Sequence, residues 1–149
     1  FDENKIIDDP TIYVNITSKD VPSDSPESCE NWFVMVNSPF NTGQDWEKIK
    51  NNLRLNIISK LERILKENIS SNIVEERIYT PVDLESNTNS HQGSLYGISS
   101  NNKFSAFLRH PNFLKKIPNL YFCGGSVHPG GGIPLCLLSA KIVSNLIEK

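Results

Sequence analysis

The chain has 149 residues, a net charge of −2 and 38% hydrophobic residues. This length suits one domain with its own hydrophobic core. Acidic and basic residues are mixed without a basic patch, which argues against nucleic-acid binding. No apolar run is long enough to cross a bilayer, and no signal peptide is visible. Three cysteines without a CxxC pair indicate a reducing compartment, so we expect a cytoplasmic location.

The first half of the chain predicts two strands and a long helix. Residues 11–17 alternate between apolar and polar, as in a strand with one buried face. Residues 32–37 predict a second strand, antiparallel to the first and joined to it by a loop too long for a tight hairpin. A helix is predicted over residues 44–67, capped by Asn41 or Thr42. Its apolar stripe, expected to pack as core against a sheet, comprises Trp46, Ile49, Leu53, Ile57, Leu61, Ile64 and Leu65.

The middle of the chain is more polar. Residues 73–79 predict a third strand that lies at an edge or has a solvated face, because it carries three charged residues. Thr80 and Pro81 predict the start of a short helix, with the threonine as cap and the proline at the first helical position. Residues 91–97 predict a loop with two glycines around Tyr96.

The most informative stretch is residues 117–149, which predict a strand, a glycine-rich turn and a helix. Residues 120–123 form a short apolar run, and two glycine clusters follow it. Apolar residues then recur at helical spacing at Leu135, Leu138, Ile142 and Leu146. Glycines let a ligand approach the backbone, and the amides at a helix start favour negative charge. A plain tight turn before a helix remains the alternative interpretation.

No metal site is expected, because the three histidines lie on different predicted elements without metal-binding spacing. We assign no catalytic side chain. The three histidines are His91, His110 and His128.

The glycine-rich stretch NLYFCGGSVHPGGGIPLCLLSAK, residues 119–141, resembles the C-terminal flavin signature of the phytoene and carotenoid desaturase family. The family pattern is an apolar strand, a Gly-rich segment containing His-Pro-Gly and Gly-Ile-Pro, and a helix. Weaker resemblance runs through nearly the whole chain, at residues 9–13, 30–32 and 93–97. The order Arg109-His110-Pro111 departs from the family pattern, which puts any role for Arg109 or His110 in doubt.

This resemblance implies FAD as the cofactor and desaturation of a carotenoid or related isoprenoid polyene as the reaction. The backbone of the motif would then approach FAD. Gly124, Gly125 and Ser126 would lie near the pyrophosphate or ribitol, and Gly132, Ile133 and Pro134 against the isoalloxazine. Tyr96 and His128 are expected to lie near the flavin or substrate, with a packed tyrosine and a turn-stabilising histidine as alternatives.

The family's usual start, a strand followed by GxGxxG and a helix, has no counterpart here. We therefore expect the C-terminal part of a longer flavoenzyme, which a start at Phe1 rather than Met also fits. The implied fold is α+β to α/β: an antiparallel substrate-side sheet with a long helix in residues 1–116, then a strand–turn–helix in residues 117–149 that returns to the FAD-binding domain.

The expected partners are the N-terminal part of the same protein and an isoprenoid substrate, and peripheral membrane docking is expected of the parent, because such substrates dissolve only in lipid. Two alternatives to a carotenoid desaturase stay open. One is another flavoenzyme of the superfamily, similar to retinol saturases or amine oxidases. The other is a non-enzymatic domain that binds a lipid or a partner.

Overall fold

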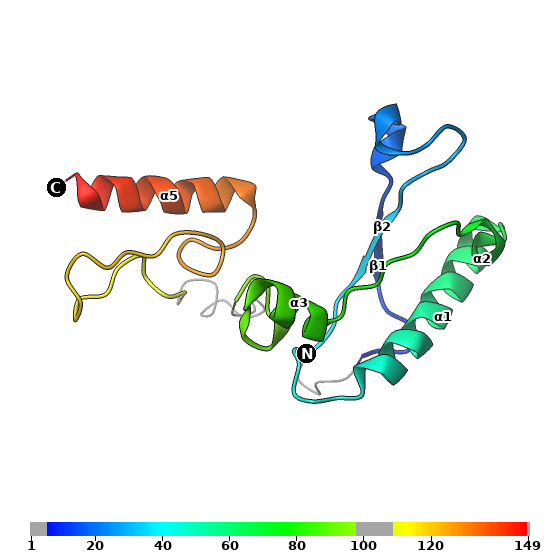
Figure 1. The fold of residues 1–149 in the computed structure, drawn as a ribbon, viewed down its shortest axis with the longest axis horizontal. Coiled ribbons are helices and arrows are strands. Elements are labelled where there is room, and N and C mark those ends of the chain that lie inside the picture. The colour runs from blue at the N-terminus through cyan, green and yellow to red at the C-terminus, as the bar shows by residue number, and fades with distance from the viewer. Residues whose placement is uncertain (1–5, 98–108, 149) are drawn as a thin grey trace. The chain divides into compact units, whose positions relative to one another are not determined.

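The computed structural model describes residues 6–97 and 109–148. The chain divides into two compact units, Phe1–Thr80 and Pro81–Lys149 (Figure 1). The described part contains a two-stranded antiparallel sheet and several helices, which is a small mixed α/β arrangement. None of the described helices is both long and apolar enough to cross a membrane.

The first unit contains the two predicted strands. β1 (Ile12–Asn15) pairs antiparallel with β2 (Phe33–Val36), and Ile12 lies opposite Val36. Along β1 the side chains alternate between half-buried and exposed, which confirms the predicted one-sided strand. Two 3₁₀ turns, Thr17–Lys19 and Pro22–Asp24, occupy the long connection. The side-chain oxygen of Asn31 accepts a hydrogen bond from the Ser18 amide (3.0 Å) and so ties the end of this connection back to its start.

The predicted long helix is α1 (Trp46–Leu65), the green-cyan helix of Figure 1. Its cap is neither Asn41 nor Thr42, because the Asp45 side chain accepts from the Lys48 amide (3.0 Å). Asn41 has a different role: its Oδ1 accepts from Nε1 of Trp46 (3.0 Å). The predicted stripe is buried or half-buried up to Leu61, whereas its last two members, Ile64 and Leu65, are exposed.

The predicted third strand over residues 73–79 is wrong. A short helix, α2 (Ile69–Asn72), precedes this segment, and the segment itself runs without pairing to a strand. The carboxylate of Glu62 accepts from the amide of Ser70 (2.9 Å), which favours the helical turn there. The following residues project into solvent, with Val74 90% exposed, and Glu76 forms an ion pair with Arg54 at 2.6 Å. The composition of residues 73–79 suits a strand, but the segment has no partner strand to pair with and is an extended connection.

The second unit begins with α3 (Pro81–Thr88), which confirms the predicted helix start at Thr80 and Pro81. A 3₁₀ turn, His91–Gly93, follows. The strand predicted over residues 120–123 is wrong: this segment forms one isolated antiparallel bridge, between Phe113 and Tyr121. The predicted last helix is confirmed as α5 (Ile133–Ile147), the orange-to-red helix of Figure 1, with Pro134 in its first turn.

Large apolar side chains are exposed in both units. Among the described residues, the buried large apolar side chains are Trp46 and Leu61, at 7% and 9% exposure. Both strands expose apolar or aromatic side chains, as do both long helices. A two-stranded ribbon is marginal in water unless another element covers a face. The exposed set includes Tyr13, Phe33, Met35, Leu55, Ile64, Leu137 and Leu138.

We therefore expect the 149-residue chain alone to bind a hydrophobic dye and to unfold gradually in urea. Dye fluorescence and circular dichroism would measure this, because exposed apolar surface binds the dye and a small core gives weak cooperativity. The comparison is the longer protein, meaning the product of the longest reading frame that includes this chain. A sharp transition without dye binding in the short chain would contradict the expectation.

Candidate functional site

The candidate site is the glycine loop, residues 123–132, which lies between the Phe113–Tyr121 bridge and the start of α5. Gly124, Gly130 and Gly132 have φ angles of 122°, 138° and 97°. L-amino acids with a β-carbon rarely adopt such angles, so this backbone path depends on glycine. The peptide bond between His128 and Pro129 is cis.

A buried asparagine, Asn112, supports this loop through hydrogen bonds. Asn112 is 3% exposed, and its Nδ2 lies 3.0 Å from the carbonyl oxygen of Phe122 and 2.9 Å from that of His128. The same nitrogen lies 2.9 Å from Oγ of Ser139, a fully buried residue of α5. Oγ of Ser139 in turn accepts from the amide of Gly124 (3.2 Å). One side chain thus links the residue before the loop and the middle of the loop to the helix.

Backbone pairing adds to this framework. The amide of Phe122 donates to the backbone carbonyl of Asn112 (2.8 Å). The amide of His128 donates to the backbone carbonyl of His110 (2.9 Å). His128 therefore contributes to the turn through both its amide and its carbonyl, while the residue as a whole is exposed. The ring of His110 packs edge-on against Phe122, with centroids 5.0 Å apart.

Tyr96 packs against the loop at Gly131. A β-carbon at Gly131 would lie 2.7 Å from Cδ1 of Tyr96, so only glycine fits there. Arg109 lies beside Tyr96 and donates from Nη1 to the carbonyl oxygens of Tyr96 (2.8 Å) and Gly125 (2.9 Å). The structure thus brings Tyr96 together with the predicted cofactor-binding residues, through Gly131 and Arg109.

The predicted residues at the start of α5 are exposed. Gly132 is the N-cap, no side chain caps the helix, and the amide of Cys136 donates to the Gly132 carbonyl (2.9 Å). The first amides of a helix have no partner within the helix, and Pro134 has no amide hydrogen. Ile133 is 78% exposed. This helix start therefore presents backbone donors and an apolar side chain to its surroundings.

The loop has room for a ligand against its backbone. A β-carbon built on Gly124 or Gly132 would meet no atom within 4 Å. Ser126 is exposed, and its amide makes no hydrogen bond in the part of the chain that the structure describes. Open space beside glycine backbone, unpartnered amides and the positive end of a helix dipole suit an anionic or electron-rich group such as the phosphates or the N1/O2 edge of FAD. The residues present therefore fit the cofactor that the sequence implies.

Two residues of this arrangement were missed by the sequence reasoning. Asn112 received no role, and any role for Arg109 was doubted because of the order of the neighbouring residues. A polar amide between the apolar residues of 104–122 was the available signal, since a buried asparagine must satisfy its hydrogen bonds. Nothing in the residue pattern indicated that Arg109 would reach two carbonyl groups.

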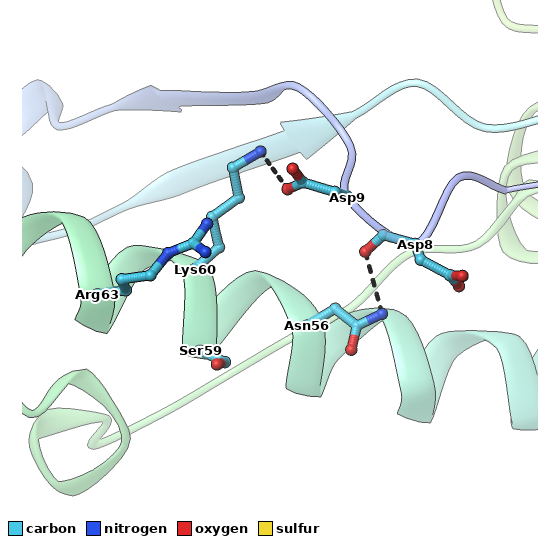
Figure 2. Close-up of a pocket in the computed structure, with 6 residues that line it drawn as sticks. All are labelled: Asp8, Asp9, Asn56, Ser59, Lys60 and Arg63. Atoms are coloured by element: carbon cyan, nitrogen blue, oxygen red, sulfur yellow. Dashed lines mark hydrogen bonds and ion pairs between the residues drawn. The ribbon is translucent and has the colours of Figure 1, made fainter.

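A polar pocket of about 310 Å³ lies in the first unit and contains none of the predicted site residues. Figure 2 shows two contacts among the residues that line it: Nζ of Lys60 lies 2.6 Å from Oδ1 of Asp9, and Asn56 donates to the Asp8 carbonyl (3.2 Å). The hydrogen bond from Lys60 holds the pKa of Asp9 below its usual range. These contacts hold the N-terminal segment against α1. The residues that line the pocket are polar or charged, so it is unsuited to an apolar substrate.

Residues 6–97 and 109–148 contain no group of three His, Cys, Asp or Glu side chains that could hold a metal ion. The three cysteines are free thiols. The loop predicted over residues 91–97 lies within the described part, whereas residues 98–108 lie outside it.

Replacing Asn112 by leucine is expected to destabilise the second unit by about 2–4 kcal/mol, because two carbonyls with partly buried hydrogen bonds and the buried Ser139 hydroxyl lose their donor. The measurement is the urea dependence of proteolytic cleavage within residues 81–149 in the longer protein. Asn52→Leu, at an exposed position of α1, is the matched control and is expected to change little. Equal effects of the two substitutions would show that Asn112 does not hold the loop.

The comparisons with known proteins agree with the sequence resemblance. No family model matches the chain. Over 99% of its length the chain is 56% identical to a 1-hydroxycarotenoid 3,4-desaturase of Flavobacterium sp. (strain P99-3). It is 35% identical to a 4,4'-diaponeurosporene oxygenase of Staphylococcus aureus (strain MSSA476) and 33% identical to a 4,4'-diapolycopene oxygenase of Methylomonas sp., again over 99% of the chain.

The chain spans about 30% of the length of each of these relatives. The predicted resemblance is thereby confirmed: the chain is homologous to a segment of carotenoid desaturases and oxygenases.

Proposed function

We propose that this chain is the C-terminal segment of an FAD-dependent oxidoreductase that desaturates a carotenoid. The observation that carries the proposal is the glycine loop, whose open backbone leads into an uncapped helix start. The similarity to carotenoid desaturases and oxygenases over 99% of the chain supports the same conclusion. The other 70% or so of each relative's length is where we expect a GxGxxG segment for the ADP half of FAD.

In this proposal the cofactor contacts are made by backbone. Gly124, Gly125 and Ser126 lie near the pyrophosphate or ribitol of FAD, where amide donors bind oxygen. Gly132 and Ile133 lie against the isoalloxazine, and the positive end of α5 stabilises negative charge at its N1/O2 edge. Pro134 gives the first turn its rigidity without adding a donor. Tyr96 and His128 flank this site.

FAD supplies the two-electron acceptor, which no side chain of the chain can replace. The chain's own residues orient the cofactor, stabilise charge and exclude water. A site built from glycine, proline and backbone amides suits a protein that leaves the electron transfer to the cofactor, because electrostatic stabilisation by a backbone needs no titrating side chain. The exposed Ile133 and Tyr96 offer apolar contact to a polyene or to the flavin.

The exposed apolar residues of α5 support the expected division of the chain. In the proposal residues 117–149 pack on the FAD-binding domain and residues 1–116 form the substrate side. Leu135, Leu137 and Leu138 are exposed close to the glycine loop and would be covered by that domain. The substrate dissolves only in lipid, so we expect the whole protein to meet it at a membrane surface.

Oxygenation of a carotenoid is the second candidate, because relatives at 33% and 35% identity are named as oxygenases. The relative at 56% identity is named as a desaturase, which favours desaturation for this chain. The two reactions differ in product: desaturation removes two hydrogens from the polyene, whereas oxygenation adds oxygen.

Flavin retention tests the proposed function. The longer protein is expected to purify with the visible absorbance of bound flavin, whereas the 149-residue chain alone is expected to bind FAD poorly, because it lacks a GxGxxG segment. Gly132→Val in the longer protein is expected to abolish flavin retention, because φ at this position is 97° and the β-carbon enters the open space.

Gly43→Val is the matched control for backbone strain, since Gly43 has φ of 90° and also meets no atom within 4 Å of a built β-carbon, but lies in the first unit. If the wild-type longer protein neither carries flavin nor binds it on titration, the proposal is wrong. With flavin bound, mass spectrometry of products from hydroxylated and unmodified carotenoids would separate desaturation from oxygenation.

A further inference from the structure

Arg109 joins two segments that lie far apart in the sequence. Its Nη1 donates to the carbonyl oxygen of Tyr96 (2.8 Å) and to that of Gly125 (2.9 Å). Hydrogen bonds from a charged guanidinium are stronger than those between neutral groups, and the planar guanidinium group fixes their direction. Arg109 is only partly exposed, which limits competition from water. The turn that carries Tyr96 is thereby linked to the glycine loop.

The glycine loop is shaped to admit this side chain. A β-carbon on Gly130 would lie 3.1 Å from Nε and 3.3 Å from Cζ of Arg109. Gly130 is itself buried. The guanidinium therefore occupies the space that a side chain at position 130 would fill, and it contacts the loop on both sides of the cis His128–Pro129 bond.

The bond to Gly125 fixes the orientation of one peptide group. The Gly125–Ser126 bond is trans, because His128–Pro129 is the cis bond found in the described residues. In a trans peptide the carbonyl and the following amide point in opposite directions. With the Gly125 carbonyl directed at Arg109, the Ser126 amide must point away from it. That amide has no hydrogen-bond partner among the described residues.

We propose that Arg109 is a positioning residue for the cofactor: by binding the carbonyl of Gly125 it directs the amide of Ser126 toward the oxygen atoms of bound FAD. This inference rests on the proposed function, since it assigns a role within the same site. Arg109 acts through the peptide group and does not itself touch the reacting atoms. Without it, the Gly125–Ser126 peptide is free to rotate and the donor is lost from the site.

The test uses the longer protein with Arg109→Gln and Arg109→Lys, and Arg63→Gln on α1 as the matched control. FAD affinity of the apoproteins is measured by quenching of flavin fluorescence, and their melting temperatures are measured without FAD. We expect Arg109→Gln to weaken FAD binding roughly tenfold or more, because a charged donor to the loop is lost. Arg109→Lys keeps the charge and is expected to recover part of the affinity. Arg63→Gln is expected to bind like the wild type.

A purely structural role predicts a different pattern. The melting temperature of the Arg109→Gln apoprotein would then fall as far as that of Asn112→Leu, and lysine would rescue stability without affinity. Wild-type affinity in Arg109→Gln would overturn the inference while the proposed function stands. Absence of FAD binding in the wild-type protein would overturn both.

Discussion

The second unit depends on one buried hydrogen-bonding pair, Asn112 and Ser139. The amide nitrogen of Asn112 has two hydrogens and three oxygen neighbours, so one hydrogen is shared between two acceptors. Its orientation is unambiguous, because two of these neighbours are carbonyls that can only accept. Removing a donor from one buried and two partly buried acceptors is costly, and this pair therefore specifies how α5 sits against the glycine loop.

This pair also explains which face of α5 packs. The predicted stripe used Leu135, Leu138, Ile142 and Leu146. In the structure the first two are exposed, and the N-terminal half of the helix turns Cys136 and Ser139 inward instead. The polar contact of Ser139 outweighs the apolar periodicity there, since an unpaired buried polar group costs more than an exposed leucine. Ile142 and Leu146 are half-buried, as their spacing indicated.

Local signals predicted most elements of the chain. The alternation of β1, the stripe of α1, the Thr-Pro start of α3 and the Pro134 start of α5 are each encoded within a few residues. The two wrong strands, 73–79 and 120–123, have suitable composition, but strand formation requires a partner, which a single segment does not reveal. The glycine loop was located from its motif, whereas its supports at Arg109 and Asn112, which each reach it across 16 residues, were not, because contacts at such separations leave no local pattern.

The two side chains that support the loop have a common property: both only donate to its carbonyls. Asn112 binds the carbonyls of Phe122 and His128 through its NH₂ group, and Arg109 binds that of Gly125. Because these hydrogen bonds end on backbone carbonyl oxygens, they form whatever side chains Phe122 and His128 carry, and the support of the loop depends on the donors at Asn112 and Arg109 rather than on side chains of the loop itself.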